Sequence, residues 1–184
     1  MARTPSNMIP LLSQAPDFTL PDLILGEQKS LMELKGENGT FIMFICNHCP
    51  FVVHVIDTLV NLANHYQKEG INFIAINSND VVNYPDDSPE KMVLFAQKHK
   101  FTFPYLFDEL QEIAKNYDAA CTPDFYLYDK NLKLNYRGQL DSSRPDNGEA
   151  KDGKDLREAF EYLLNDKGIL ESQTPSLGCN IKWK

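Results

Sequence analysis

The stretch Cys46-Asn47-His48-Cys49-Pro50 stands between an apolar run and an apolar pattern at helical spacing. The run before it, residues 40–45, mixes aromatic with β-branched side chains, which predicts a buried strand. After Pro50 the apolar residues recur on one helix face: Val52, Val53, Ile56, Leu59, Val60, Leu62 and Ala63. The two cysteines therefore mark the point where a strand passes into a helix. The first turn of a helix carries unsatisfied N–H groups and about half a positive charge, so it stabilises a thiolate, the reactive form of cysteine.

Two cysteines three positions apart at a helix start can close a small disulfide ring. We expect Cys46, at the turn, to attack a partner disulfide, and Cys49, one turn further in, to resolve the mixed disulfide. A positive charge on the intervening His48 should lower the pKa of Cys46 and make the pair more oxidising. The alternative for a single C-x-x-C is half of a zinc site, but Cys121 and Cys179 stand alone and supply no second pair. We therefore expect redox chemistry without a bound metal.

The bulk composition is that of a soluble globular protein. The chain has 184 residues, of which 42% are hydrophobic and 24% charged, enough for one sizeable core. The net charge of -8 argues against nucleic acid or an anionic membrane as a partner. No apolar run approaches the roughly 20 residues of a membrane span. The N-terminal residues lack the apolar core of a secretory signal, so we expect a cytoplasmic location, with a mature periplasmic or secreted form as the alternative. No phosphate-binding or dinucleotide motif indicates a cofactor.

The order of the predicted elements indicates one α/β domain over residues 1–184. Strand 40–45, a helix over about 50–68 and strand 71–77 form a βαβ unit, whose two strands should be parallel. The other elements are expected as follows: an extended pair from residues 17–25 and 30–34, a helix at about 89–99, an extended segment at 103–108, a helix at about 109–117, a hairpin of 125–128 with 132–136, and a helix at about 153–166. A central mixed sheet flanked by helices satisfies this order. Residues 1–16 should form a loosely ordered N-terminal arm, and residues 169–184 a C-terminal tail without regular structure.

A second motif, Cys121-Thr122-Pro123, directly precedes a predicted strand. A proline at this place, with threonine ahead of it, is a candidate cis-proline. A cis bond would present the backbone N–H and C=O of Thr122 beside the cysteine pair, where a substrate polypeptide could pair like an added strand. The alternative is a trans proline that opens an edge strand. Cys121 would approach the active site, or it would be a small buried hydrophobic residue.

The two motifs together resemble the thioredoxin fold. The opening residues Ala15-Pro16-Asp17-Phe18-Thr19-Leu20 resemble the start of the alkyl hydroperoxide reductase/thiol-specific antioxidant group, the redoxins. Four further segments, 44–52, 121–125, 137–145 and 175–183, are similar to a bacterial thioredoxin-family group with Asn-His between its cysteines. This resemblance implies a thioredoxin-like thiol–disulfide oxidoreductase in which Cys46 attacks, Cys49 resolves and Pro123 is the cis-proline. It also implies protein or small-molecule disulfides and a thiol reductant as partners, and an antioxidant role in cell redox homeostasis.

Two alternatives to disulfide exchange stay open. Peroxiredoxins reduce hydroperoxides with a Thr-x-x-Cys motif and a nearby arginine, and their peroxidatic cysteine would fall on Cys49. In this chain Cys46 takes the place of the threonine, which weakens the resemblance, and Arg137 would supply the charge unless it is a solvated strand residue. The other alternative is a metal-binding redoxin that uses Cys46, His48 and Cys49.

The remaining two cysteines admit more than one interpretation. Cys179, in the tail, could pair with Cys121, relay electrons from the Cys46–Cys49 pair, or be an unpaired thiol.

Overall fold

The computed structural model describes residues 3–184. It contains a seven-stranded mixed sheet in the order β3-β2-β6-β5-β4-β8-β9 and a small three-stranded sheet in the order β1-β10-β7. The strands are β1 (Thr4–Pro5), β2 (Thr19–Asp22), β3 (Glu27–Ser30), β4 (Gly39–Phe44), β5 (Ile71–Asn77), β6 (Tyr105–Phe107), β7 (Cys121–Thr122), β8 (Asp124–Asp129), β9 (Leu134–Tyr136) and β10 (Leu177–Asn180). The helices are α1 (Leu31–Leu34), α2 (Pro50–Tyr66), α3 (Pro89–Lys98), α4 (Glu112–Asn116) and α5 (Lys154–Leu164), with 3-10 turns η1 (Gln67–Glu69) and η2 (Pro85–Asp87). The predicted mixed sheet flanked by helices is confirmed.

Strand β4 is the centre of the large sheet and leads directly to the cysteine pair. It pairs parallel with β5 from Gly39↔Ile71 to Phe44↔Ile76, as the predicted βαβ unit requires, and antiparallel with β8 on its other side. All six of its residues are buried. A strand that has neighbours on both edges and is covered on both faces buries all its side chains. Its sequence is therefore an almost continuous apolar run, as the sequence before Cys46 is.

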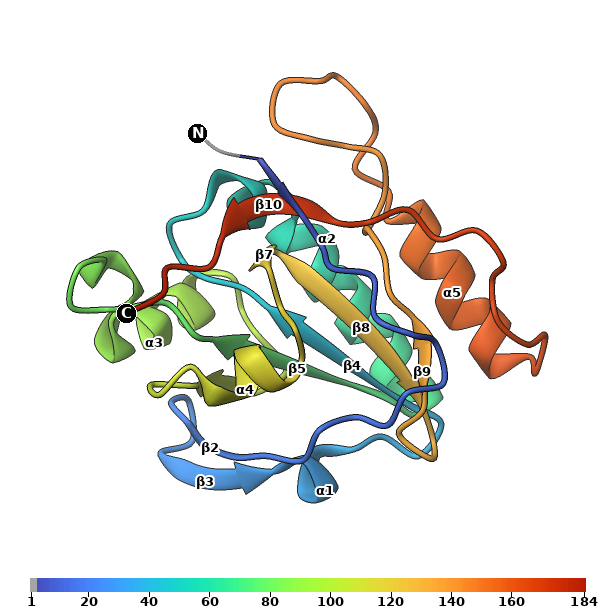
Figure 1. Cartoon of the computed structure of the whole chain (residues 1–184), viewed down its shortest axis with the longest axis horizontal. Coiled ribbons are helices and arrows are strands. Elements are labelled where there is room, and N and C mark those ends of the chain that lie inside the picture. The colour runs from blue at the N-terminus through green and yellow to red at the C-terminus, as the bar shows by residue number, and fades with distance from the viewer. Residues whose placement is uncertain (1–2) are drawn as a thin grey trace.

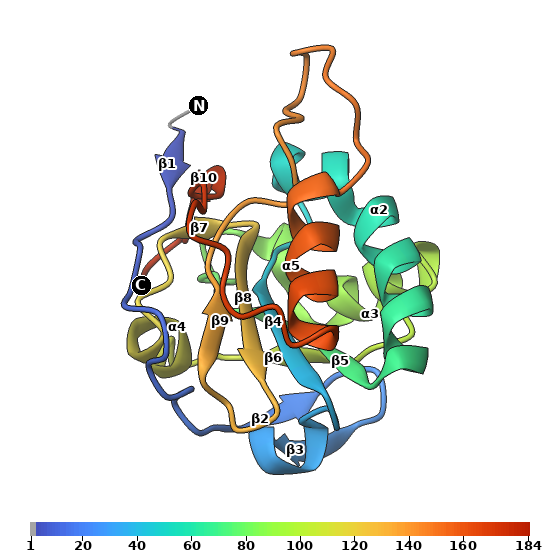
Figure 2. The ribbon, with the colours of Figure 1, turned by 90° about the vertical axis from the view of Figure 1, so that its right-hand side faces the viewer.

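Alternate residues of the central strands pack into two separate cores, because successive side chains of a strand point to opposite faces. Phe41 and Met43 join the core under α2, α3 and α5. Ile42 and Phe44 join the second core, which includes residues of α4, the N-terminal arm and the C-terminal tail. Figure 2 shows α2, α3 and α5 together on one side of the sheet and the arm and α4 on the other.

The arm and the tail are paired with each other, so the predictions of a loose arm and an irregular tail are wrong. In the part of each that the structure describes, β1 pairs antiparallel with β10, and β10 pairs antiparallel with β7. In Figure 1 the blue arm crosses the red tail close to β7, where β8 begins. Both segments also contribute to the second core, through Ala15 and Ile181. The tail is thereby fixed across the end of the sheet that carries the cysteines.

One predicted extended segment, residues 30–34, begins a helix instead. The hydroxyl of Ser30 accepts a hydrogen bond from the Glu33 backbone N–H, and the Glu33 carboxylate accepts one from the Ser30 N–H. This capping box satisfies two orphan backbone donors and turns the chain into α1 after β3.

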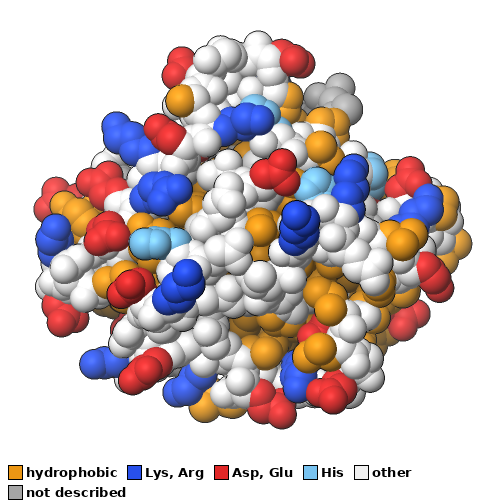
Figure 3. All heavy atoms as spheres, turned by 180° about the vertical axis from the view of Figure 1, so that it is seen from behind, with side chains coloured by type: hydrophobic (Ala, Val, Ile, Leu, Met, Phe, Trp, Pro, Cys, Tyr) orange, Lys and Arg blue, Asp and Glu red, His pale blue; other side chains and the backbone are white. Residues whose placement is uncertain are grey.

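The outer surface carries charges of both signs. On the face opposite to that of Figure 1, acidic and basic side chains lie interspersed among apolar ones (Figure 3). Within residues 3–184, no helix has both the length and the apolar character that crossing a membrane requires.

Candidate functional site

The cysteine pair lies between β4 and α2, as predicted, with Cys49 as the N-cap residue of α2. Pro50 takes the first helical position, where its fixed φ suits the helix and its missing N–H costs no hydrogen bond. Cys46 comes two residues after β4. Both side chains are buried, with 1% and 0% of their surface exposed. Cys49 therefore sits at the positive end of a 17-residue helix and shielded from water.

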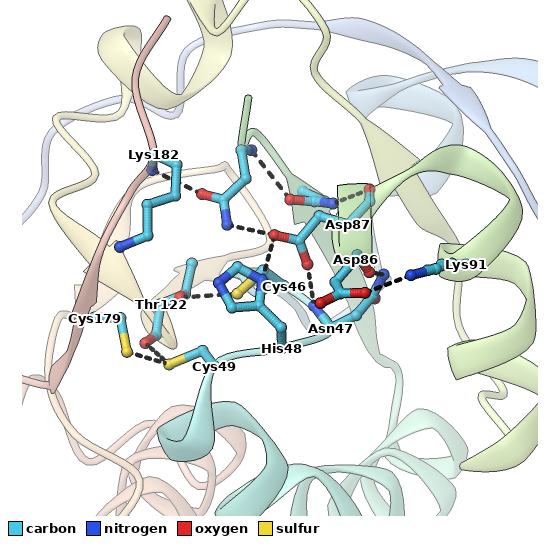
Figure 4. Close-up of polar contacts among 12 residues, drawn as sticks. Cys46, Asn47, His48, Cys49, Asp86, Asp87, Lys91, Thr122, Cys179 and Lys182 are labelled. Atoms are coloured by element: carbon cyan, nitrogen blue, oxygen red, sulfur yellow. Dashed lines mark hydrogen bonds and ion pairs between the residues drawn. The ribbon is translucent and has the colours of Figure 1, made fainter. Parts of the chain in front are cut away.

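The sulfur of Cys49 has two close partners from outside the pair. Its Sγ lies 3.1 Å from the carbonyl oxygen of Thr122 and 2.9 Å from the Sγ of Cys179 (Figure 4). The Sγ of Cys46 lies 3.3 Å from the Oγ1 of Thr122. The Thr122–Pro123 peptide bond is cis, which confirms the prediction, and Thr122 contacts both sulfurs of the pair.

The backbone edge of Thr122 is not open in the way the sequence predicts. Thr122 is paired with Cys179 in the β7–β10 ladder. Gly178 packs so closely on this peptide that a Cβ atom there would lie 2.1 Å from the Thr122 carbonyl oxygen. Only glycine allows this approach between two backbones. The chain's own C-terminal strand occupies the edge that was expected to receive a substrate.

The electrostatics of the pair favour ionisation of Cys49. Its pKa is lowered to about 5, first because the Cys46 thiol donates a hydrogen bond to its thiolate, and then through Cys179 and the backbone N–H of Val52, against the effect of burial. The pKa of Cys46 is raised well above its ordinary value, because its thiol hydrogen-bonds to Cys49, because it is buried and because it faces the charge of Asp87. These directions are opposite to the prediction, which placed the lowered pKa on Cys46.

The imidazole of His48, which was predicted to lower the pKa of Cys46, is paired with Asp87. The Nδ1 of His48 lies 2.7 Å from the carboxylate of Asp87, and this close carboxylate raises the pKa of His48. Asp87 is fully buried and also accepts hydrogen bonds of 2.8 Å from the Asn47 backbone N–H and from the side-chain amide of Asn79. The positive charge of the imidazole is therefore balanced by a carboxylate that sequence reasoning missed.

Asp87 lies in η2, within a polar segment that the sequence indicates to be a surface loop. Its only local signal is its place before Ser88 and Pro89, the predicted and observed N-cap and first residue of α3. Nothing in that spacing connects it with a cysteine pair about 40 residues earlier. Asn47 makes the connection, because its backbone N–H donates to Asp87 and its side-chain amide donates to the carbonyl oxygen of Asp86, which brings η2 against the turn that carries the cysteines.

Arg137 is neither a solvated strand residue nor a free charge that could serve a peroxide site. Its side chain is fully buried and pairs with Asp124, with Nη2 donating at 3.0 Å. Its Nη1 also donates to the carbonyl oxygen of Phe125 at 3.1 Å, and the guanidinium lies 3.9 Å from the ring centroid of Tyr126. Arg137 is thus not a solvated strand residue, and its charge is paired with the carboxylate that directly follows the cis-proline.

Cys121 and Cys179 occupy different sides of the small sheet. In the β7–β10 ladder Thr122 is opposite Cys179 and Cys121 is opposite Asn180. Because neighbouring side chains on a strand point to opposite faces, Cys121 points away from the face that carries Cys179. The pKa of the buried Cys121 thiol is raised, chiefly by burial. The register thus argues against a Cys121–Cys179 disulfide and places Cys179 with the active pair.

A group of metal-ligating atoms also meets here, in a different set from the predicted one. Ligand atoms of Cys46, His48 and Asp87 lie within 4.8 Å of one another. Cys49, the third member of the predicted set, instead faces Thr122 and Cys179. The Asp87 oxygens already accept hydrogen bonds, so a metal ion would have to displace His48 or an asparagine donor from them.

Comparison with known proteins places the chain in a family of thiol-dependent redox proteins. A model of the AhpC/TSA family matches residues 11–137. The chain belongs to the AhpC/TSA family. A thiol-disulfide oxidoreductase ResA from Geobacillus thermodenitrificans is 32% identical over 122 residues, which are 66% of this chain and 65% of the relative. The match thus spans slightly less than two thirds of that relative's own length.

Solved structures of similar proteins confirm the thioredoxin-like fold. An uncharacterized conserved protein from Geobacillus kaustophilus is 54% identical, with a TM-score of 0.98 over 100% of this chain and 97% of that one. A putative thiol:disulfide interchange protein DsbE from Chlorobium tepidum has a TM-score of 0.69 over 85% of this chain and 99% of that one, at 19% identity. At that identity the likeness is one of fold alone.

Proposed function

We propose that this protein is a thiol–disulfide oxidoreductase in which Cys49 supplies the attacking thiolate. The observation that carries the proposal is the position of Cys49, buried at the N-cap of α2 with its sulfur 2.9 Å from that of Cys179 and with its pKa lowered to about 5. Membership of the AhpC/TSA family and the ResA relative support the same chemistry.

The exchange proceeds in two steps that conserve electrons. The Cys49 thiolate attacks one sulfur of a partner disulfide, forms a mixed disulfide and releases the other partner sulfur as a thiolate. The Cys46 thiol then gives up its proton to that thiolate and attacks the Cys49 sulfur. The second partner sulfur leaves as a thiolate, the partner is reduced by two electrons, and a Cys46–Cys49 disulfide remains. The order of attack is the reverse of the one expected from the motif alone, because the pKa directions are reversed.

The partners in this proposal are disulfides of proteins or small molecules on one side and a thiol reductant on the other. All three sulfurs at the site are buried, so a partner disulfide must displace part of the cover to reach Cys49. A cytoplasmic location and an antioxidant role stay predictions from the sequence.

Insulin reduction by dithiothreitol tests the proposal. Wild-type protein should accelerate the reaction, and Cys49→Ser should abolish the acceleration. The double variant Cys46→Ser/Cys179→Ser, which removes both sulfurs that could attack a mixed disulfide at Cys49, should accumulate protein joined to the substrate through Cys49. Cys121→Ser is the matched control, since Cys121 is equally buried but faces away from the pair, and it should keep wild-type activity. Acceleration that survives Cys49→Ser, or a wild-type protein without any effect, would contradict the proposal.

Hydroperoxide reduction is a second candidate, favoured by the lowered pKa of Cys49 at a helix N-terminus. The thiolate would attack the peroxide oxygen, giving an alcohol or water and a sulfenic acid at Cys49, and Cys46 would then close the disulfide with loss of water. Consumption of peroxide by the reduced wild-type protein, absent in Cys49→Ser, would support this activity. Peroxide consumption equal in the two proteins would exclude it.

A further inference from the structure

We propose that Cys179 is a third redox thiol, which exchanges with Cys46 for a disulfide bond to Cys49. This inference rests on the proposed function and extends it, because it makes Cys49 the shared member of two alternative disulfides. It also gives the C-terminal strand a covalent connection to the active site.

The first observation is the contact between the sulfurs. The Sγ atoms of Cys49 and Cys179 are 2.9 Å apart, and a disulfide bond is about 2.05 Å long, so bond formation needs a movement of roughly 1 Å. Figure 4 shows Cys179 approaching Cys49 from the C-terminal strand, on a different side from Cys46. Cys49 is therefore placed between two sulfurs that come from different parts of the chain.

The second observation is that β10 is held tightly on both sides of Cys179. Before it, Gly178 packs against the Thr122 peptide, and Ser176 Oγ donates to the carbonyl oxygen of Pro123 at 2.8 Å. After it, the backbone N–H of Lys182 donates at 2.9 Å to Asn79, the residue that also donates to Asp87. The sulfur of Cys179 is thus positioned by the same network that positions the pair.

The exchange is balanced within the chain. In the oxidised protein, the Cys179 thiol loses its proton and attacks the Cys49 sulfur of the Cys46–Cys49 disulfide. A Cys49–Cys179 bond forms, the Cys46–Cys49 bond breaks, and Cys46 takes up the proton. No external oxidant or reductant takes part, because both states hold one disulfide. Negative charge on Cys49 contributes to the raised pKa of Cys179 in the reduced protein, and a disulfide at Cys49 removes that charge.

The two disulfides differ in what they leave accessible to a partner. With Cys46–Cys49 joined, β10 is held on β7 by non-covalent contacts alone, and the Thr122 edge can be uncovered. With Cys49–Cys179 joined, β10 is covalently fixed over that edge, and Cys46 carries the thiol. The position of the disulfide would therefore decide whether an extended substrate can pair beside the cis-proline.

Disulfide mapping after oxidation with one equivalent of diamide tests the inference. Cleavage after lysine and arginine leaves Cys46 and Cys49 in one peptide, 36–68, and Cys179 in another, 168–182. In Cys46→Ser these two peptides should be recovered joined, in an amount independent of protein concentration. In the wild type both forms should appear after alkylation, one with the link inside peptide 36–68 and one with it between the peptides. Cys121→Ser, the matched control, should give the wild-type pattern.

A glycine variant tests the geometry while keeping all four cysteines. In Gly178→Ala the new Cβ must push β10 away from Thr122. The fraction of protein that contains the Cys49–Cys179 disulfide should therefore fall several-fold, while the Cys46–Cys49 disulfide still forms. Circular dichroism of the variant confirms that the fold is retained.

The possible failures are distinguishable. If Cys49 in oxidised Cys46→Ser is found unlinked, or linked only to another molecule, the proposed role of Cys179 is overturned, even if the wild type reduces insulin. A wild-type protein that forms no disulfide between Cys46 and Cys49 and reduces no insulin would instead overturn the proposed function.

Discussion

The ionisation of Cys49 should be measurable as the pH profile of its alkylation. At pH 7 a thiol with a pKa of about 5 is almost fully ionised, whereas an ordinary cysteine with a pKa of about 8.5 is about 3% ionised. The intrinsic nucleophilicity of a thiolate falls with its pKa, with a Brønsted coefficient of about 0.45, which costs Cys49 a factor of roughly 40. The two effects nearly cancel at pH 7, so a rate measured only at that pH would not reveal the low pKa.

At lower pH the advantage appears. At pH 5 Cys49 is half ionised and an ordinary cysteine about 0.03% ionised, so after the same correction Cys49 should react about 40-fold faster. The assay is iodoacetamide labelling from about pH 4 to pH 10, with each cysteine quantified by fragmentation of the labelled peptide. Burial slows the reagent at every pH and leaves the midpoint of the profile unchanged.

Substitution of the neighbouring thiols should shift that midpoint in a defined order. Cys46→Ala removes the hydrogen bond that lowers the pKa of Cys49 most, so it should raise the midpoint further than Cys179→Ala does. Cys46→Ser keeps a hydroxyl donor and serves as the control with the smaller effect. A wild-type midpoint near 8.5 for Cys49, or a lower midpoint for Cys46 than for Cys49, would refute the reasoning.

Two further predictions concern stability. Arg137→Met leaves Asp124 buried without its ion-pair partner and should lower the free energy of unfolding, measured in urea, by about 3–5 kcal/mol. The control Arg157→Met changes an exposed arginine and should alter this free energy by less than about 0.5 kcal/mol. Equal effects of the two substitutions would show that the buried ion pair is dispensable. The pKa of His48 is raised by Asp87, so its contribution is fully present below the unfolded pKa of about 6.5 and is lost as pH rises through the folded value. The stability difference between wild type and His48→Gln should therefore shrink from about pH 6 upward, and a constant difference in urea titrations would contradict this.

The sequence was informative where function depends on neighbours along the chain. The strand before Cys46, the helix after Pro50 and the Thr122–Pro123 element each leave a local pattern of periodicity or punctuation, and each was found where predicted. The proline after the second cysteine also marks Cys49 as the N-cap of the helix, a position that favours ionisation of its thiol.

The sequence was uninformative where function depends on residues that meet only in the folded chain. The charge of His48 is balanced by Asp87, and a carboxylate in a polar segment carries no sign that it will be buried. Cys179 lies in a tail of mixed composition, and its strand, β10, has only four residues. A strand of that length is too short to show an alternation of apolar and polar residues in the sequence. Long-range contacts of this kind determine the pKa of both cysteines and could not be read from either motif.

The pairing of β1 with β10 has a practical consequence for anyone who handles this protein. Strand β1 pairs directly with β10, the strand that carries Cys179. Near the C-terminus, the backbone N–H groups of Lys182 and Lys184 donate hydrogen bonds to the side chains of Asn79 and Gln111. Changes that weaken the pairing of β1 with β10 should therefore loosen the strand that holds the Cys179 sulfur against Cys49, and should shift the redox potential measured for the site.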